Sequence, residues 1–149
     1  MGRPPRLPGA FLVVAGVILV LAGAAAIAVG LVNPALISSQ LPPDAEVDAP
    51  AVGGAAVALG AATAFLGVVH VATAIGLRLG IGIAATGAVV LASTMAVLSL
   101  GFAVAALVSI ASGAAPAIYM VPAAVGLGAA VIGYAAVTVA VIGARRAPT

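Results

Sequence analysis

The sequence predicts an all-α integral membrane protein, folded as an antiparallel up-down bundle of four transmembrane helices with Gly/Ala heptad packing. Hydrophobic residues make up 65% of the 149 residues and charged residues only 5%, whereas a soluble domain carries roughly 25% charged residues. Four apolar segments each reach the roughly 20 residues that a helix needs to cross the hydrocarbon core. Because these segments use almost the whole length, we expect a single membrane domain over residues 1–149.

The spans follow from the lengths of the apolar segments and from the residues that interrupt them. We expect them at about 10–32, 51–77, 79–111 and 121–144. The charge-free run from Leu79 to Ala144 is too long for one crossing at roughly 1.5 Å per residue, so it must fold back. The break is expected at residues 112–116, with Pro122 opening the fourth helix, because proline is accepted at a helix start and disfavoured inside a helix.

Charged residues set the expected orientation. With four crossings, all five arginines fall on one side of the membrane: Arg3, Arg6, Arg78, Arg145 and Arg146. The three acidic residues share the first loop, residues 33–50, on the other side. The positive-inside rule therefore places both termini in the cytoplasm and the loop outside. Because every basic residue is Arg and Ala and Gly dominate, as in GC-rich bacterial genomes, we expect a multi-pass protein of the bacterial inner (plasma) membrane.

Small residues recur at every seventh position in each span. The glycines of this pattern are Gly9, Gly16, Gly23 and Gly30; Gly53, Gly60 and Gly67; Gly80, Gly87 and Gly101; and Gly126 and Gly133. Ala74, Thr94 and Ala140 continue it. Positions seven apart lie on one stripe of a helix, and small residues there let helix backbones approach closely in lipid. A sustained period of seven favours left-handed crossings of roughly +20°.

The stripes have two interpretations that the sequence leaves open. All four stripes can face inward and hold one copy of the chain together. Alternatively, a stripe that the bundle does not need can face outward and form an oligomerisation surface. We therefore expect membrane lipid as a partner in either case, and a homo-oligomer or a larger membrane complex in the second.

Polar residues within the spans suggest one candidate layer. Counted inward from the cytoplasmic arginines, His70, Thr86 and Thr138 all lie roughly 10–12 Å deep, and Tyr134 lies one turn further in on the face of Thr138. One interpretation is a proton-sensitive gate or a small polar binding site, because His titrates near neutral pH. The other is a neutral structural His that is hydrogen-bonded to a hydroxyl or a backbone carbonyl.

Two aromatic residues lie near the predicted membrane surfaces. Phe11 follows the start of the first span and Tyr119 precedes the fourth. Aromatic side chains are enriched at both interfaces of a bilayer. We therefore expect both residues to act as interfacial anchors.

The residues available for chemistry are few. The chain has one His, no Cys and no acidic residue within a predicted span, so we expect no enzyme activity, no metal site and no cofactor. Its arginines lie singly or in pairs at span ends, which does not indicate nucleic-acid binding. We expect a non-catalytic scaffold or accessory subunit that packs through its glycine stripes. The alternative is a passive channel or carrier for a small neutral solute or ion, lined by Ser and Thr hydroxyls and by His70.

Overall fold

The computed structural model describes residues 6–39, 48–114 and 116–146, and every regular element within these ranges is a helix. The elements are α1 (Arg6–Val32), α2 (Pro34–Ser38), α3 (Ala49–Arg78), α4 (Gly82–Ala111) and α5 (Ala117–Arg146). All but α2 are long and apolar enough to cross a membrane. The predicted fold class, an all-α four-helix membrane bundle, is confirmed, and the chain is a multi-pass membrane protein.

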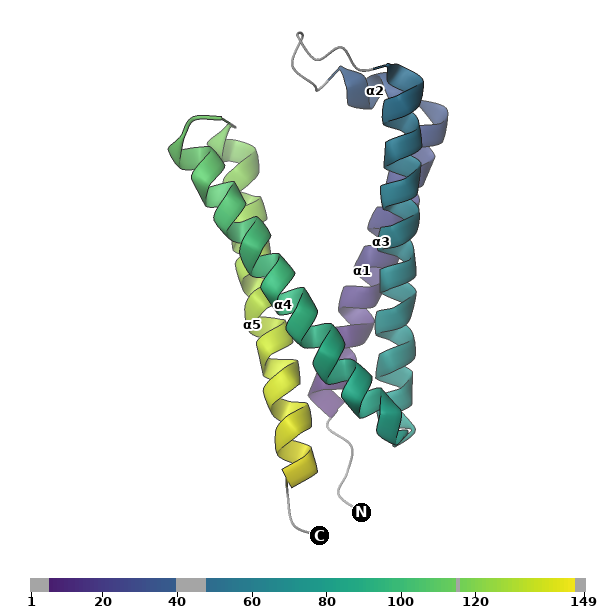
Figure 1. The fold of residues 1–149 in the computed structure, drawn as a ribbon, viewed down its shortest axis with the longest axis vertical. Coiled ribbons are helices and arrows are strands. Elements are labelled where there is room, and N and C mark those ends of the chain that lie inside the picture. The colour runs from purple at the N-terminus through teal and green to yellow at the C-terminus, as the bar shows by residue number, and fades with distance from the viewer. Residues whose placement is uncertain (1–5, 40–47, 115, 147–149) are drawn as a thin grey trace. The chain divides into compact units, whose positions relative to one another are not determined.

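The chain divides into two compact units. Unit 1 comprises residues 1–11 and 73–149, and unit 2 comprises residues 12–72. In unit 2, α1 and α3 lie side by side and antiparallel, because Gly16 meets Gly67 near one end and Gly30 meets Gly53 near the other (Figure 1). In unit 1, α4 packs along α5 (Figure 1). Each unit therefore contains one antiparallel pair of long helices.

The first loop contains a short helix that the sequence did not suggest. Asn33 caps α2: its side-chain Oδ1 accepts a hydrogen bond from the backbone N–H of Leu36 at 3.2 Å. Pro34 occupies the first helical position, where its missing N–H is not needed. Residues 34–38 of the predicted first loop are therefore helical. The acidic residues Asp44 and Glu46 lie outside the described residues.

Glycines end α3 and α4 in the same way. Gly80 has φ +72° and Gly113 has φ +69°, a left-handed conformation that glycine adopts without steric cost. After α3, the N–H of Ile81 donates to the carbonyl of Gly76 and that of Gly80 to the carbonyl of Leu77, which is the Schellman pattern. Residues 79–81 form this turn, so the third span begins at Gly82 rather than at 79.

The fourth long helix begins earlier than expected, and Pro122 does not open it. The carbonyl of Pro116 accepts hydrogen bonds from the N–H groups of Tyr119 and Met120, which starts α5 at Ala117. Pro122 lies inside α5. Its missing N–H removes the bond to the carbonyl of Ile118, near the exposed end of the helix, and such a loss is tolerated in membrane helices. The predicted break at residues 112–116 does separate α4 from α5.

Candidate functional site

Pairs of glycines face one another between α1 and α3 in unit 2. A Cβ atom added to Gly16 would lie 2.7 Å from the carbonyl oxygen of Gly67, and one added to Gly67 would lie 2.6 Å from the carbonyl oxygen of Gly16. A carbon atom does not fit at these distances, whereas a hydrogen does. The two backbones are therefore close enough for reciprocal Cα–H···O contacts, which are worth roughly 0.5–1 kcal/mol each.

The same reciprocal arrangement repeats every two turns along α1 and α3. A Cβ on Gly60 would lie 2.7 Å from the carbonyl oxygen of Gly23, and one on Gly23 would overlap the carbonyl oxygen of Gly60. At the C-terminal end of α1, a Cβ on Gly30 would lie 2.8 Å from the carbonyl oxygen of Gly53. A Cβ on Gly53 would lie 2.7 Å from the carbonyl oxygen of Gly30. We call these three pairs, Gly16/Gly67, Gly23/Gly60 and Gly30/Gly53, the glycine seam.

The α4 helix uses a different stripe for burial. Its buried residues are Ala88, Ala92, Ser99, Ala103 and Ala106. They lie on one side of the helix, and α5 is the long helix that α4 packs against in unit 1. We call these five residues the alanine stripe. The residues Gly87, Thr94 and Gly101 are exposed instead, about 140° around the helix from the alanine stripe.

Open space surrounds most of the remaining glycines of the heptad pattern. No heavy atom lies within 4 Å of a Cβ added to Gly80, Gly87, Gly101 or Gly126. At Gly133 the ring of Phe11 occupies the space that a Cβ would need. Gly9 lies against the last turn of α3, where an added Cβ would be 3.8 Å from Nε of Arg78.

His70 lies on α3 within unit 2 and is fully buried. Its ring Nδ1 donates a hydrogen bond to the carbonyl oxygen of Leu66, one turn earlier, at 2.8 Å. A Cβ added to Gly16 would lie 3.0 Å from Cβ of His70, so the residue borders the glycine seam. The structure thus gives His70 a structural contact within its own helix.

The other three residues of the candidate polar layer belong to unit 1. Thr86 is exposed, and its Oγ1 accepts a hydrogen bond of 2.8 Å from Nη2 of Arg145. The same Nη2 donates to the carbonyl oxygen of Gly82 at 3.3 Å, so Arg145 of α5 holds the first turn of α4. Thr138 donates to the carbonyl oxygen of Tyr134 on its own helix. A layer that joins these residues to His70 stays a prediction.

Two other hydroxyl groups within the long helices donate hydrogen bonds to their own helix. Thr63 donates to the carbonyl of Leu59 and Ser109 to that of Ala105, each four residues earlier. Such bonds are the usual arrangement of Ser and Thr in a helix. Hydroxyls engaged in this way are poor candidates for the lining of an aqueous path.

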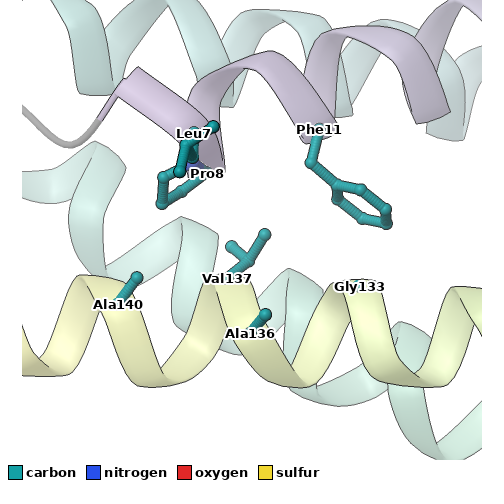
Figure 2. Close-up of a pocket in the computed structure, with 7 residues that line it drawn as sticks. All are labelled: Leu7, Pro8, Phe11, Gly133, Ala136, Val137 and Ala140. Atoms are coloured by element: carbon teal, nitrogen blue, oxygen red, sulfur yellow. The ribbon is translucent and has the colours of Figure 1, made fainter.

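A groove in unit 1 lies between the start of α1 and α5 and has a volume of about 350 Å³. It is lined by Leu7, Pro8, Phe11, Gly133, Ala136, Val137 and Ala140. Figure 2 shows Leu7 and Pro8 above the Ala140 end and Phe11 above Gly133. The Phe11 ring also meets the Tyr134 ring edge to face, with centroids 5.1 Å apart and an interplanar angle of 89°. The lining carries no polar side chain.

Two of these contacts were missed at the sequence level. Phe11 packs onto Gly133 and Tyr134 as well as lying near a predicted membrane surface. Arg145 contacts Thr86 although the two residues are 59 positions apart. A signal was present in both cases: a large ring can only rest against a helix at a small residue, and an arginine that ends one helix can reach a hydroxyl near the start of its antiparallel neighbour.

Comparisons of the chain with family models, with curated proteins and with solved structures find no match.

Proposed function

We propose that the protein is a non-catalytic scaffold or accessory subunit of the bacterial inner membrane, which packs through a glycine stripe against a second copy or a larger membrane complex. The observation that carries this proposal is the contrast between the two long-helix pairs. The six glycines of the glycine seam face one another between α1 and α3 in unit 2, whereas Gly87 and Gly101 of α4 have open space around them. Exposed small residues at a heptad period favour helix association in lipid.

The local hydrogen bonds of the hydroxyl groups support a scaffold over a channel. Thr63, Ser109 and Thr138 donate within their own helices, and Thr86 accepts from Arg145. The groove beside Phe11 has an apolar lining, which favours hydrocarbon over water. A path for a polar solute would need polar groups aimed into a common space, and these groups are directed elsewhere.

The stripe can be tested by changing one glycine and measuring assembly. Gly101→Leu fills the open space beside α4 with a bulky side chain and should abolish association of the full chain, measured by native mass spectrometry in mild detergent. Gly54→Leu is the matched control, because Gly54 is equally exposed, has no atom within 4 Å of an added Cβ, and lies off the heptad stripe. A wild-type protein that is monomeric and retains no other membrane subunit would overturn the proposal.

The proposed orientation places both termini in the cytoplasm and the first loop outside. The chain contains no Cys, so single-cysteine variants report one position each. In intact cells, an impermeant thiol reagent should label Glu46→Cys and leave Arg78→Cys unlabelled, because arginines remain on the cytoplasmic side. The opposite labelling pattern would reverse the orientation, and labelling of both variants would contradict four crossings.

A further inference from the structure

The short helix α2 follows the first membrane span after a single residue, Asn33, and belongs to unit 2. Three large apolar side chains are exposed here: Leu31 and Val32 at the end of α1, and Leu36 on α2. We propose that these side chains insert into the lipid at the membrane surface, so that α2 lies between the headgroups and the acyl chains. The inference does not depend on the scaffold role, because it concerns an end of unit 2 and not the α4 stripe.

The depth of α2 follows from the helix beside it. A Cβ added to Gly53 would lie 3.0 Å from Cβ of Pro34, so α2 begins next to the second turn of α3. Gly53 precedes Arg78 by 25 residues, a rise of about 37 Å. The hydrocarbon core is about 30 Å thick, and about 40–45 Å with both headgroup regions. With Arg78 at one membrane surface, Gly53 and the start of α2 reach the headgroup region of the other.

The direction of α2 suits a helix that lies along the surface. Figure 1 shows that α2 turns away from the axis of α1 instead of extending it. Pro34, Ile37 and Ser38 are half-buried, whereas Ala35 and Leu36 are exposed. The exposed apolar surface of the α1 span therefore continues onto α2. A helix with one apolar face buries that face at the boundary between headgroups and acyl chains.

The polar side chains of the segment are hydrogen-bonded within it. Asn33 Oδ1 accepts from the N–H of Leu36 at 3.2 Å. Ser38 Oγ donates to the carbonyl of Ala35 at 3.2 Å, and Ser39 Oγ donates to the carbonyl of Leu36 at 2.9 Å. Polar groups that already have partners lose less free energy when they leave water. A five-residue helix is too short to be stable alone in water, whereas scarce water at the interface favours internal hydrogen bonds.

The charge of the segment defines the kind of lipid contact. Residues 31–39 contain no charged side chain. Attraction to anionic headgroups requires Lys or Arg close to the surface, so insertion of α2 relies on apolar contact with the glycerol and acyl region. We therefore expect the same depth of α2 in neutral and in anionic membranes.

The depth of α2 can be measured with a nitroxide spin label, because the chain has no Cys and a single cysteine marks one position. In phosphatidylcholine liposomes, a label at Leu36→Cys should collide more often with oxygen, which enters lipid, than with a water-soluble nickel chelate. Asp48→Cys is the matched control and should show the opposite preference. Asp48 is also exposed and lies about 7.5 Å further out than Gly53 along the chain of α3. Equal access of the chelate to both labels would overturn the proposal.

Two further measurements test the kind of contact. In phosphatidylglycerol liposomes the Leu36→Cys label should report the same depth, and insertion only into these anionic liposomes would contradict the apolar contact. A label at Ala35→Cys, also exposed on α2, should become more accessible to the nickel chelate when Leu36→Asn is added. Unchanged access in that double variant would overturn the assignment of Leu36 as the inserted side chain.

Discussion

The two long-helix pairs share a seven-residue period and use it in different ways. In unit 2 the heptad glycines of α1 and α3 face one another. The carbonyl oxygens of one helix occupy the space that Cβ atoms on the other helix would need. In unit 1 the buried side of α4 is its alanine stripe, and the heptad glycines Gly87 and Gly101 lie on another side. A period of seven therefore indicates that a helix has a packing stripe, but it does not indicate which of two small-residue stripes a neighbour covers.

The difference also separates two kinds of close packing. Glycine pairs bring backbones together and gain Cα–H···O contacts between main chains. Alanine pairs keep a methyl group between the helices, which preserves the stronger helix propensity of alanine. The glycine seam should therefore be intolerant of added atoms, and the alanine stripe should be intolerant of removed ones. Adding one methyl group to the glycine seam and removing one from the alanine stripe test this contrast.

The largest effect is expected from adding one methyl group to the glycine seam. Gly23→Ala places a Cβ against the carbonyl oxygen of Gly60 and 2.6 Å from the backbone nitrogen of Ala64. Because these are backbone atoms, the helices must separate, and we expect a loss of roughly 1–3 kcal/mol of stability. Unfolding in mixed detergent micelles measures it. In the monomeric chain, Gly101→Ala is the control, since its Cβ meets no atom of the same chain and alanine improves helix propensity by up to about 1 kcal/mol.

Opposite signs for these two Gly→Ala variants would establish that the heptad glycines of the chain have different surroundings. Equal destabilisation would mean instead that the α4 stripe is covered as closely as the glycine seam. Equal stabilisation would mean that α1 and α3 are further apart than the described geometry. Either result would break the comparison between the two regions.

A smaller effect is expected from the reverse change in the alanine stripe. Ala92 is fully buried on α4, so Ala92→Gly removes a methyl group from the contact and lowers helix propensity by about 1 kcal/mol. Gly54→Ala changes the same single methyl group in the opposite direction at an exposed position and should have no packing effect. Unfolding in mixed micelles again gives the free energies. An Ala92→Gly protein as stable as the wild type would show that the alanine stripe carries little of the packing in unit 1.

The sequence was sufficient for the fold class and for the approximate spans. Composition and length require membrane helices, and the glycine turn at residues 112–114 marks the return between α4 and α5. The starts of α1 and α5 were harder to predict from the sequence. Pro8 lies in the first turn of α1, where no N–H is needed. Pro122 is accommodated inside α5. Helix ends were therefore set by local hydrogen bonds that residue type alone did not specify.

The candidate site was less predictable than the fold. The depth of a residue follows from counting along one helix, which grouped His70 with Thr86 and Thr138. The direction in which a side chain points depends on the neighbour that the helix packs against. Arg145 of α5 donates a hydrogen bond to the hydroxyl of Thr86 on α4, and the Phe11 ring of α1 lies against Gly133 of α5. Both contacts form because these helices meet within unit 1. Neither contact could be derived without the pairing of the helices.

The smallest effect is expected at His70, beside the glycine seam. His70 is fully buried and donates from Nδ1 to the carbonyl of Leu66, and a hydrogen bond within a membrane protein contributes only about 0.6 kcal/mol. Gln retains an N–H donor on a flexible side chain, so His70→Gln should change the unfolding free energy by less than Gly23→Ala does. The variant should also leave the assembly state unchanged. Liposome flux measurements on the same protein provide the decisive comparison, since a scaffold conducts no solute with either residue. A pH-dependent flux that is present in the wild type and altered in His70→Gln would instead support the channel, and would make His70 more important than the glycines beside it.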